Sequence, residues 1–298
     1  MRKKHRAGFV AILGRPNAGK STLLNALLGT KLAIVASKPQ TTRTSIQGVL
    51  TLREAQIIFI DTPGIHKSDT LLNRRMMDAV RAAAEAPDVV LFVIDVLAAP
   101  IDEDMRALDL AKKAGVPVVA VLNKIDWLKT KPEILTRIEQ YRAWHDFAAY
   151  VPVSARRGTG LDELQEEIVK HLPVGPALFP DDYITDQPER FFASEVIREK
   201  VLHHTDKEVP HAVAVVIESW EETPKLVRIA ATIYVEKPGQ KAILIGAGGA
   251  MLKKIGTQAR HDLEHALDRK VFLETFVKVR THWREDPGFL PVTDWRSQ

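Results

Sequence analysis

Residues 14–21 read Gly14-Arg15-Pro16-Asn17-Ala18-Gly19-Lys20-Ser21. The stretch follows an apolar run and precedes a helical pattern, so it matches the phosphate-binding loop GxxxxGK[ST] in its strand–loop–helix setting. Glycines let backbone N–H groups converge on phosphates, and the dipole of the following helix favours their negative charge. Lys20 is expected to neutralise the β- and γ-phosphate oxygens, and the Ser21 hydroxyl to ligate Mg²⁺. A tight turn without a ligand is the alternative, and the context of the loop argues against it.

Around this loop, apolar runs alternate with amphipathic helical stretches over residues 1–172. Several runs are apolar throughout, which is typical of strands that are buried on both faces. We expect strands at residues 9–13, 57–60, 89–94, 116–122 and 150–153, and helices at 20–28, 73–85, 102–114, 132–147 and 160–171. The alternation predicts an α/β domain with a mostly parallel sheet and helices on both faces.

Residues 173–190 hold four prolines and a run of acidic residues, so they are expected to form a linker between domains. The order of elements changes beyond it. A helix at 189–204 precedes strands at 212–220 and 226–236, a helix–loop–helix at 240–267 and a strand at 271–283. This order predicts a smaller α+β domain over residues 191–298, ending in a C-terminal tail.

Composition narrows the class of protein. The 298 residues are 45% apolar and 27% charged and include no cysteine, which excludes disulfides, thiolate nucleophiles, thiolate metal sites and iron–sulfur clusters. The longest apolar run, residues 89–94, is too short for a membrane span, and no signal-peptide pattern follows the basic N-terminus. We therefore expect a soluble intracellular protein.

Residues 237–284 carry ten Lys/Arg against four Asp/Glu, a net charge of +6. That block is either a local polyanion site or a solvated face.

Three further motifs follow predicted strands. Asp61-Thr62-Pro63-Gly64 comes after the strand at 57–60, where Asp61 can hold Mg²⁺ through water and the Gly64 N–H can reach a γ-phosphate. Asn123-Lys124-Ile125-Asp126 follows the strand at 116–122. An Asp there can accept both the N1–H and the 2-amino group of guanine, a paired contact that adenine cannot make. Ser154-Ala155 follows the next strand and would offer a backbone N–H to guanine O6.

In this order the four motifs resemble those of translation-factor-type GTPases. The resemblance implies GTP or GDP and Mg²⁺ as ligands. It implies nucleotide contacts from Gly14, Arg15, Pro16, Asn17, Ala18, Gly19, Lys20, Ser21, Thr22, Asp61, Thr62, Pro63, Gly64, Ile65, Asn123, Lys124, Asp126, Ser154 and Ala155. Lys20, Thr42 and Gly64 would take the catalytic roles, and Ser21, Thr42 and Asp61 would hold the metal.

The switch threonine follows from a second resemblance. Gln40-Thr41-Thr42-Arg43 resembles the TTR element of bacterial ribosome-assembly GTPases, which favours Thr42 as the ligand of Mg²⁺ and the γ-phosphate and leaves Thr41 as the alternative. Where many GTPases place a water-orienting Gln, this chain has Ile65, which cannot form a hydrogen bond through its side chain. Intrinsic turnover is therefore expected to be slow. Asn17 either helps to hold K⁺ near the phosphates, as the resembled group does, or simply stabilises the loop.

The second domain carries Gly246-Ala247-Gly248-Gly249 between two apolar helical segments. A GxxG there, in the order helix–strand–strand–helix–helix–strand, resembles a type II KH domain, in which the loop lets a nucleic-acid backbone pass closely. Lys253 and Lys254 follow one turn later. In the last strand, basic residues alternate with others, which would place Lys278, Arg280, His282 and Arg284 on one face, as an RNA contact or a solvated face.

With both domains in this order, the chain resembles bacterial ribosome-assembly GTPases from end to end. The resemblance implies binding near the 3′ end of 16S-type small-subunit rRNA, a role in assembly of the 30S subunit, a cytoplasmic monomer, and a peripheral association with the inner membrane. A C-terminal domain that docks on protein or membrane is the alternative. A P-loop ATPase or nucleotide kinase is a further alternative, against which Asn123–Asp126 argues.

Overall fold

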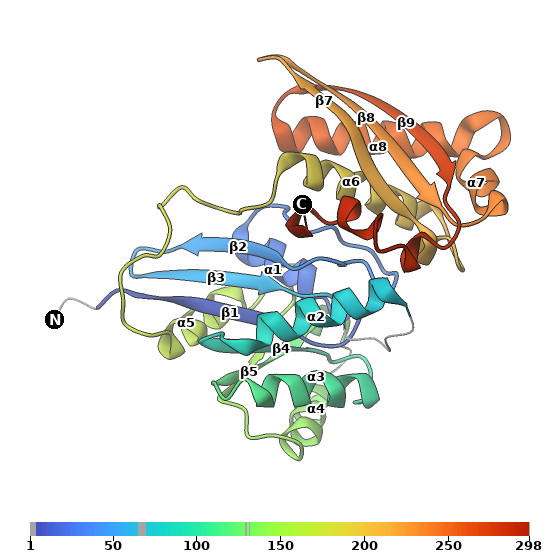
Figure 1. Ribbon diagram of the computed structural model, residues 1–298. Helices are drawn as coiled ribbons and strands as arrows, with labels where there is room; N and C mark the ends of the chain where they lie inside the picture. The colour runs from blue at the N-terminus through green and yellow to red at the C-terminus, as the bar shows by residue number, and fades with distance from the viewer. Residues whose placement is uncertain (1–3, 65–69, 129, 131, 298) are drawn as a thin grey trace. The chain divides into compact units, whose positions relative to one another are not determined.

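The computed structural model describes residues 4–64, 70–128, 130 and 132–297, and Figure 1 traces the chain. Contacts divide it into two compact units. The first takes the described residues up to Asp186 except 34–41 and 70–74, and the second takes those two segments together with residues from Gln187 onward. No helix in the described ranges is long and apolar enough to cross a membrane.

The first unit is built on a six-stranded sheet of order β2-β3-β1-β4-β5-β6. All neighbouring strands are parallel except β2 and β3, so the predicted mostly parallel sheet is confirmed. The strands are β1 (Arg6–Leu13), β2 (Ile46–Thr51), β3 (Ala55–Asp61), β4 (Val89–Asp95), β5 (Val118–Asn123) and β6 (Ala149–Pro152).

Strand β2 is absent from the strands predicted from the sequence. It lies at the sheet edge and forms an antiparallel hairpin with β3, closed by the Leu52 N–H donating to the Ala55 carbonyl at 2.7 Å. Gln47, Leu50 and Thr51 are only partly buried, and Gly48 lies within the strand, so β2 lacks the apolar run that marks the central strands.

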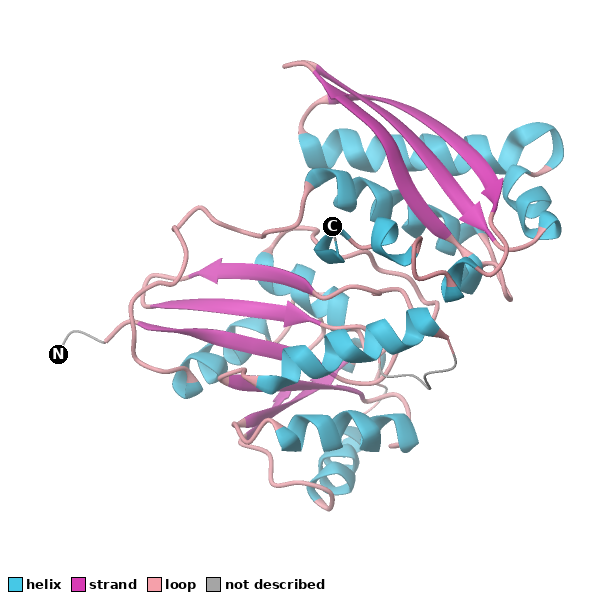
Figure 2. Cartoon of the chain, in the orientation of Figure 1, coloured by secondary structure: helices cyan, strands magenta, loops and turns pink. Residues whose placement is uncertain are grey.

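Helices cover both faces of this sheet (Figure 2). On one face, Val10 and Ile12 of β1 pack in one cluster with α1 (Lys20–Leu28) and α5 (Leu161–His171). On the other, Ala11 and Leu13 pack with α2 (Leu71–Glu85), α3 (Asp102–Lys113) and α4 (Pro132–Arg142). Successive residues of a strand point to opposite faces, so apolar residues at every position supply both cores at once.

Helix α4 ends at Arg142, not at residue 147 as predicted. The chain turns there, and the ring of Phe147 stacks on Phe92 of β4 at 5.9 Å between centroids. The apolar pattern that predicted more helix therefore belongs to a loop that reaches the same core.

The second unit contains α6 (Glu189–His204), β7 (Ala214–Glu222), β8 (Leu226–Val235), α7 (Pro238–Ile245), α8 (Ala250–Leu267) and β9 (Lys270–Val279). Its sheet has the order β7-β8-β9, with β7 antiparallel and β9 parallel to β8. Residues of α6, α7 and α8 share one buried cluster with the strands. This is the smaller α+β domain that the sequence predicts.

The prediction that the last strand runs to residue 283 is wrong. Strand β9 ends at Val279, and His282 has the left-handed φ of 54°. Trp283 is fully buried, with its Nε1 donating to the Ala212 carbonyl at 2.8 Å, so the chain turns to insert this ring. The four basic residues from Lys278 to Arg284 therefore do not share one strand face.

Residues 173–186, predicted as linker, run along the first unit. Leu178 and Phe179 donate backbone N–H groups to the Gln56 side chain at 2.7 and 2.9 Å. The Val49 N–H of β2 donates to the Ile184 carbonyl at 2.7 Å. The Val49 contact lies on the outer edge of the sheet, where β2 would otherwise expose an unpaired backbone N–H.

Candidate nucleotide-binding site

The four motifs lie at the carboxyl ends of strands β1, β3, β5 and β6, on one side of the first sheet. Residues 14–19 link β1 to α1 through three positive φ angles, at Gly14 (150°), Asn17 (61°) and Gly19 (98°). A Cβ on Gly19 would lie 2.3 Å from Asn123 Nδ2, and one on Gly14 would lie 2.6 Å from the Val93 carbonyl oxygen. Both glycines are therefore required by close packing as well as by conformation.

Three oxygen-bearing side chains converge beside the loop. The Ser21 hydroxyl donates to Asp61 at 2.7 Å and lies 2.7 Å from the Thr42 hydroxyl. Two hydroxyls and a carboxylate are the hard oxygen donors that Mg²⁺ prefers, so these residues fit the metal that the sequence predicts. Thr41 points elsewhere, because its hydroxyl donates to the Lys38 carbonyl at 2.6 Å.

Burial shifts the pKa values of the two charged residues beside the loop, Lys20 and Asp61. Lys20 donates to the carbonyls of Gly14 and Arg15, at 3.0 Å each. Burial lowers the pKa of Lys20 to about 8, and the negative charge of Asp61 opposes part of that shift. Burial likewise raises the pKa of Asp61 to about 6, opposed first by Lys20 and then by the hydrogen bond from Ser21. Burial thus disfavours the charged form of each group, and the opposite charge of the other partly offsets that effect.

The remaining phosphate-side residues lie around the loop. Thr62 is buried and donates to the Ile12 carbonyl at 2.8 Å. A Cβ on Gly64 would approach Pro16 to 2.9 Å, so the Asp61–Gly64 turn lies directly against the phosphate loop. Ala18 is buried, and Thr22 lies in the first turn of α1. Ile65 lies outside the described residues.

Asn123 ties the guanine motif to its neighbours. It is 2% exposed, donates to the Ala18 carbonyl at 2.9 Å, and accepts from the N–H groups of Ala155 and Lys124 at 3.1 and 2.8 Å. Asp126 accepts from the Ser154 hydroxyl at 2.7 Å. One residue thus joins the phosphate loop to both predicted guanine loops, a structural task beyond base recognition.

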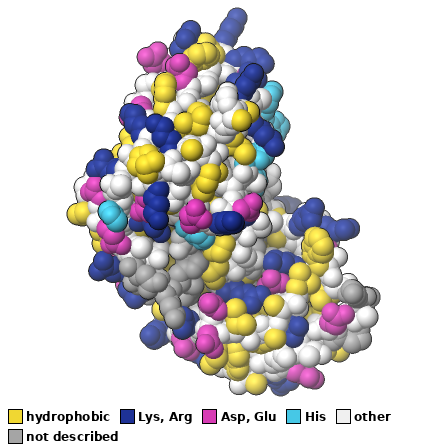
Figure 3. All heavy atoms as spheres, turned by 90° about the vertical axis from the view of Figure 1, so that its right-hand side faces the viewer, with side chains coloured by type: hydrophobic (Ala, Val, Ile, Leu, Met, Phe, Trp, Pro, Cys, Tyr) yellow, Lys and Arg dark blue, Asp and Glu magenta, His cyan; other side chains and the backbone are white. Residues whose placement is uncertain are grey.

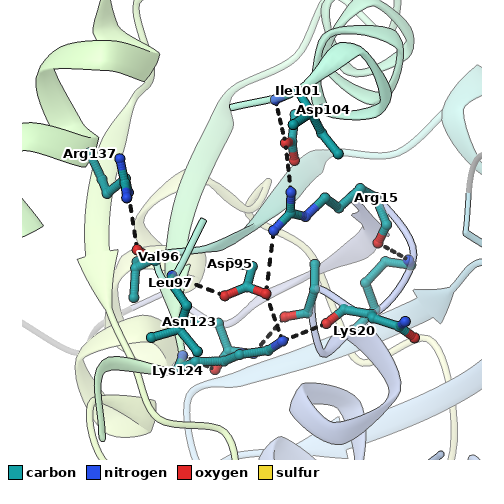
Figure 4. A network of polar contacts seen from close by, with 12 residues as sticks. Arg15, Lys20, Asp95, Val96, Leu97, Ile101, Asp104, Asn123, Lys124 and Arg137 are labelled. Carbon is teal, nitrogen blue, oxygen red and sulfur yellow. Dashed lines mark hydrogen bonds and ion pairs between the residues drawn. The ribbon is translucent and has the colours of Figure 1, made fainter. Parts of the chain in front are cut away.

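Two acidic residues of this region were missed by the sequence analysis. Figure 4 shows Arg15 between Asp95, at 3.3 Å, and Asp104, at 3.4 Å. Asp95 also pairs with Lys124 at 2.8 Å. Asp95 ends β4 as Asp61 ends β3, and this position at the carboxyl end of a strand is the signal that could have found it.

In the second unit, Gly246, Gly248 and Gly249 have φ angles of 70°, 56° and 81° between α7 and α8. A Cβ on Gly246 would approach that of Met251 to 2.8 Å, whereas Gly248 and Gly249 face open space. Ala247, Lys253 and Lys254 are exposed around them. Gly248 and Gly249 therefore leave open space beside the loop, which the close approach of a ligand backbone would require.

The basic residues after this loop differ in whether an acidic residue of the protein pairs with them. Lys278 is exposed on β9, whereas Arg280 pairs with Asp286 at 2.7 Å and Arg284 pairs with Glu236 at 2.6 Å. On the face in Figure 3, Lys and Arg side chains alternate with acidic and hydrophobic ones. Part of the positive charge of this segment is therefore neutralised within the protein.

These features define a class: a P-loop GTPase domain with a guanine-recognition motif, followed by a KH domain. Residues 9–124 match the family model described as a 50S ribosome-binding GTPase, and residues 208–284 match the KH domain model. Curated relatives include GTPase Era of Geotalea uraniireducens, 49% identical over 97% of both chains, and GTPase Era of Geobacter metallireducens, 50% identical over 96% of both. The chain belongs to the GTPase Era family.

Solved structures agree with this assignment. Aquifex aeolicus Era bound to GDP·AlF4⁻ is 41% identical, with a TM-score of 0.93 over 97% of this chain and 99% of that one. Era in complex with MgGDPNP and nucleotides 1506–1542 of 16S ribosomal RNA is also 41% identical, with a TM-score of 0.94 over 98% and 99%. The predicted family and fold, and the prediction of a GTPase with a KH domain, are confirmed.

Proposed function

We propose that this chain is a slow GTP-hydrolysing switch that binds small-subunit rRNA near its 3′ end and assists assembly of the 30S subunit. Membership of the GTPase Era family supports this, as does the relative described with MgGDPNP and 16S rRNA nucleotides. The observation that carries the proposal is the convergence of the Ser21, Thr42 and Asp61 oxygens beside the buried Lys20.

In this proposal the nucleotide contacts are those inferred from the sequence. Residues 14–22 and 61–65 surround the phosphates, and Asn123, Lys124, Asp126, Ser154 and Ala155 surround the base. Ser21, Thr42 and Asp61 would hold Mg²⁺, Asp61 through water. Mg²⁺, when bound, neutralises charge on the β- and γ-phosphate oxygens. Thr42, rather than Thr41, is the switch ligand because it adjoins Ser21.

The chain's own residues act on the γ-phosphate by charge and by hydrogen bonding. The Lys20 ammonium exchanges its hydrogen bonds to the Gly14 and Arg15 carbonyls for contacts with phosphate oxygens. The Gly64 N–H donates to the γ-phosphate. Hydrolysis is slow because Ile65 cannot orient the attacking water. K⁺ held with the help of Asn17 would add the positive charge that an arginine finger supplies in other GTPases.

RNA is proposed to bind at Gly246–Gly249, where the exposed loop is followed by Lys253 and Lys254. Lys278 contributes charge from β9. Arg280 contributes less, because its pairing with Asp286 must be broken or shared before it reaches a phosphate.

We further propose a GTPase domain over residues 1–172, a linker over 173–190 and a KH domain with its tail over 191–298. The protein would act as a cytoplasmic monomer with a peripheral association with the inner membrane.

The proposal is tested with the full chain, fluorescent GDP and ADP, and an RNA that carries the 3′ end of 16S rRNA. We expect tight GDP binding, ADP affinity at least a hundredfold weaker, and RNA affinity that exceeds that for a scrambled sequence. Equal affinity for ADP would refute guanine recognition. Failure to bind RNA, with GDP binding intact, would favour a docking module in place of the KH function.

A further inference from the structure

One carboxylate joins the loop that would hold the phosphates to the loop that would hold the base. The Asp95 Oδ2 atom lies 2.8 Å from Lys124 Nζ of the guanine motif and 3.3 Å from Arg15 Nη2 of the phosphate loop. Its other oxygen accepts from the Leu97 N–H at 3.1 Å, which fixes the carboxylate at the end of β4 (Figure 4). Asp95 therefore bridges the two loops without a place in either motif.

Each cation of this bridge has a second anchor. Lys124 donates to the Asn17 carbonyl at 2.7 Å. Arg15 lies 3.4 Å from Asp104, a fully buried residue of α3 that also accepts from the Ile101 N–H at 3.1 Å. Burial raises the pKa of Asp104, and the positive charge of Arg15 opposes that rise.

The four side chains form a charge-balanced cluster of two cations and two carboxylates, with between none and 28% of each side chain exposed. Buried ion pairs gain little over apolar packing, but removal of one partner leaves an uncompensated charge. Loss of the Asp95 charge would leave Lys124 and Arg15 close together without their shared counter-ion. The hydrogen bonds of Asn123 and Lys124 to the Ala18 and Asn17 carbonyls would remain, so the loops would stay in contact but hold their separation less firmly.

We propose that Asp95 is a positioning residue that holds the phosphate loop and the guanine loop at the separation required by one guanine nucleotide. A ligand that spans two loops pays for any ordering between them when it binds, and a preformed link removes that cost. Asp95 touches neither the base nor the γ-phosphate in this role, and acts through Arg15 and Lys124. The inference rests on the proposed GTPase function.

The test is Asp95→Asn, which keeps the size and an oxygen acceptor for Leu97 but removes the charge. Because Ser21, Lys20 and Thr42 are untouched, we expect the KM for GTP to rise at least tenfold while kcat stays within twofold of wild type. Dissociation of fluorescent GDP should accelerate by a similar factor. Asp78→Asn is the matched control: this exposed carboxylate of α2 pairs with Arg81 at 2.9 Å, and its loss should change neither quantity.

Asp104→Asn is a second variant, which removes the other carboxylate charge beside Arg15 but keeps an oxygen acceptor for the Ile101 N–H. We expect it to raise the KM about threefold with kcat unchanged. An unchanged KM in Asp95→Asn, or a fall in kcat as large as the fall in kcat/KM, would overturn the proposal. If Asp95→Asn does not fold, an unchanged KM in Asp104→Asn would overturn the proposal. Failure of the wild type to bind guanine nucleotide would instead refute the proposed function.

Discussion

The Ser21 hydroxyl donates a 2.7 Å hydrogen bond to the Asp61 carboxylate, which joins the phosphate loop to the end of β3. Burial of Asp61 disfavours its charged form, and the pKa of about 6 places its titration close to physiological pH. A divalent cation requires the charged form, so metal binding must displace any proton that Asp61 carries.

We therefore expect proton release when Mg²⁺ is titrated into the GDP complex at low pH. With a pKa of about 6, roughly three quarters of the Asp61 carboxyls carry a proton at pH 5.5, and about one in a hundred does so at pH 8. Calorimetry in buffers of different ionisation enthalpy would measure about three quarters of a proton released from Asp61 at pH 5.5 and almost none at pH 8. In Asp61→Asn the release at pH 5.5 should fall by that amount, and equal release at both pH values in the wild type would contradict the assignment.

Base choice is the second prediction. If Asp126 accepts from guanine N1–H and the 2-amino group, Asp126→Asn should weaken GTP binding about a hundredfold, because two buried donors lose their acceptor. The same variant should bind xanthosine triphosphate better than the wild type does, since the C2 carbonyl of xanthine accepts from the amide of the new Asn. Fluorescent-nucleotide titrations measure both changes. Asp109→Asn, on the exposed face of α3, serves as the control, and unchanged GTP affinity in Asp126→Asn would reject the pairing.

The third prediction separates the two roles left open for Asn17. Asn17 has a left-handed φ of 61°, and its carbonyl accepts from Lys124. These two features are enough to explain Asn17 as a residue that only stabilises the loop. If its side chain also helps to hold K⁺, hydrolysis should be faster in K⁺ than in Na⁺ at fixed ionic strength. Asn17→Ala should abolish that difference, whereas Asn17→Asp should keep it. Equal wild-type rates in both salts would leave only the structural role.

The central architecture could be predicted because burial leaves a local signal. Strands β1, β4 and β5 are apolar at nearly every position because helices cover both faces, and the motif residues follow directly where those strands end. Edge strand β2 lacks that signal. The period-two pattern from Lys278 to Arg284 predicted strand, but the need to bury Trp283 turns the chain, and only tertiary packing decides between them.

The sequence places Asp95 at the end of a strand, but its pairing with Arg15 and Lys124 could not be predicted, for a different reason. Arg15, Asp95 and Asp104 are distant in sequence, and an Arg in the phosphate loop has no fixed partner in the motif. Its pairing depends on how β4 and α3 present their carboxylates, which neither composition nor spacing specifies. The resemblance already favoured Thr42 over Thr41, and the position of Ser21 beside Thr42 adds a support for that proposal that the sequence does not contain.

RNA binding provides the last prediction. Gly249 has a φ of 81° and faces open space, so Gly249→Asp adds bulk and charge where an RNA phosphate should pass. Asp and Asn both tolerate the left-handed conformation, so Gly249→Asn separates charge from bulk. We expect RNA affinity to fall at least tenfold, about 1.4 kcal/mol, in Gly249→Asp and less in Gly249→Asn. Gly239→Asp is the control, because Gly239 also faces open space in the same unit but lies outside the loop.

Salt dependence then tests whether Lys253 and Lys254 act through phosphates. If the wild type neutralises roughly 3–4 phosphates, log K against log salt concentration should slope by about −2 to −3. The pair Lys253→Ala and Lys254→Ala should flatten that slope and weaken binding to all sequences alike, because exposed lysines read charge and not bases. GTP hydrolysis without RNA should stay near the wild-type rate in these variants. Wild-type RNA affinity in Gly249→Asp, or an unchanged slope in the lysine pair, would exclude this loop as the RNA contact.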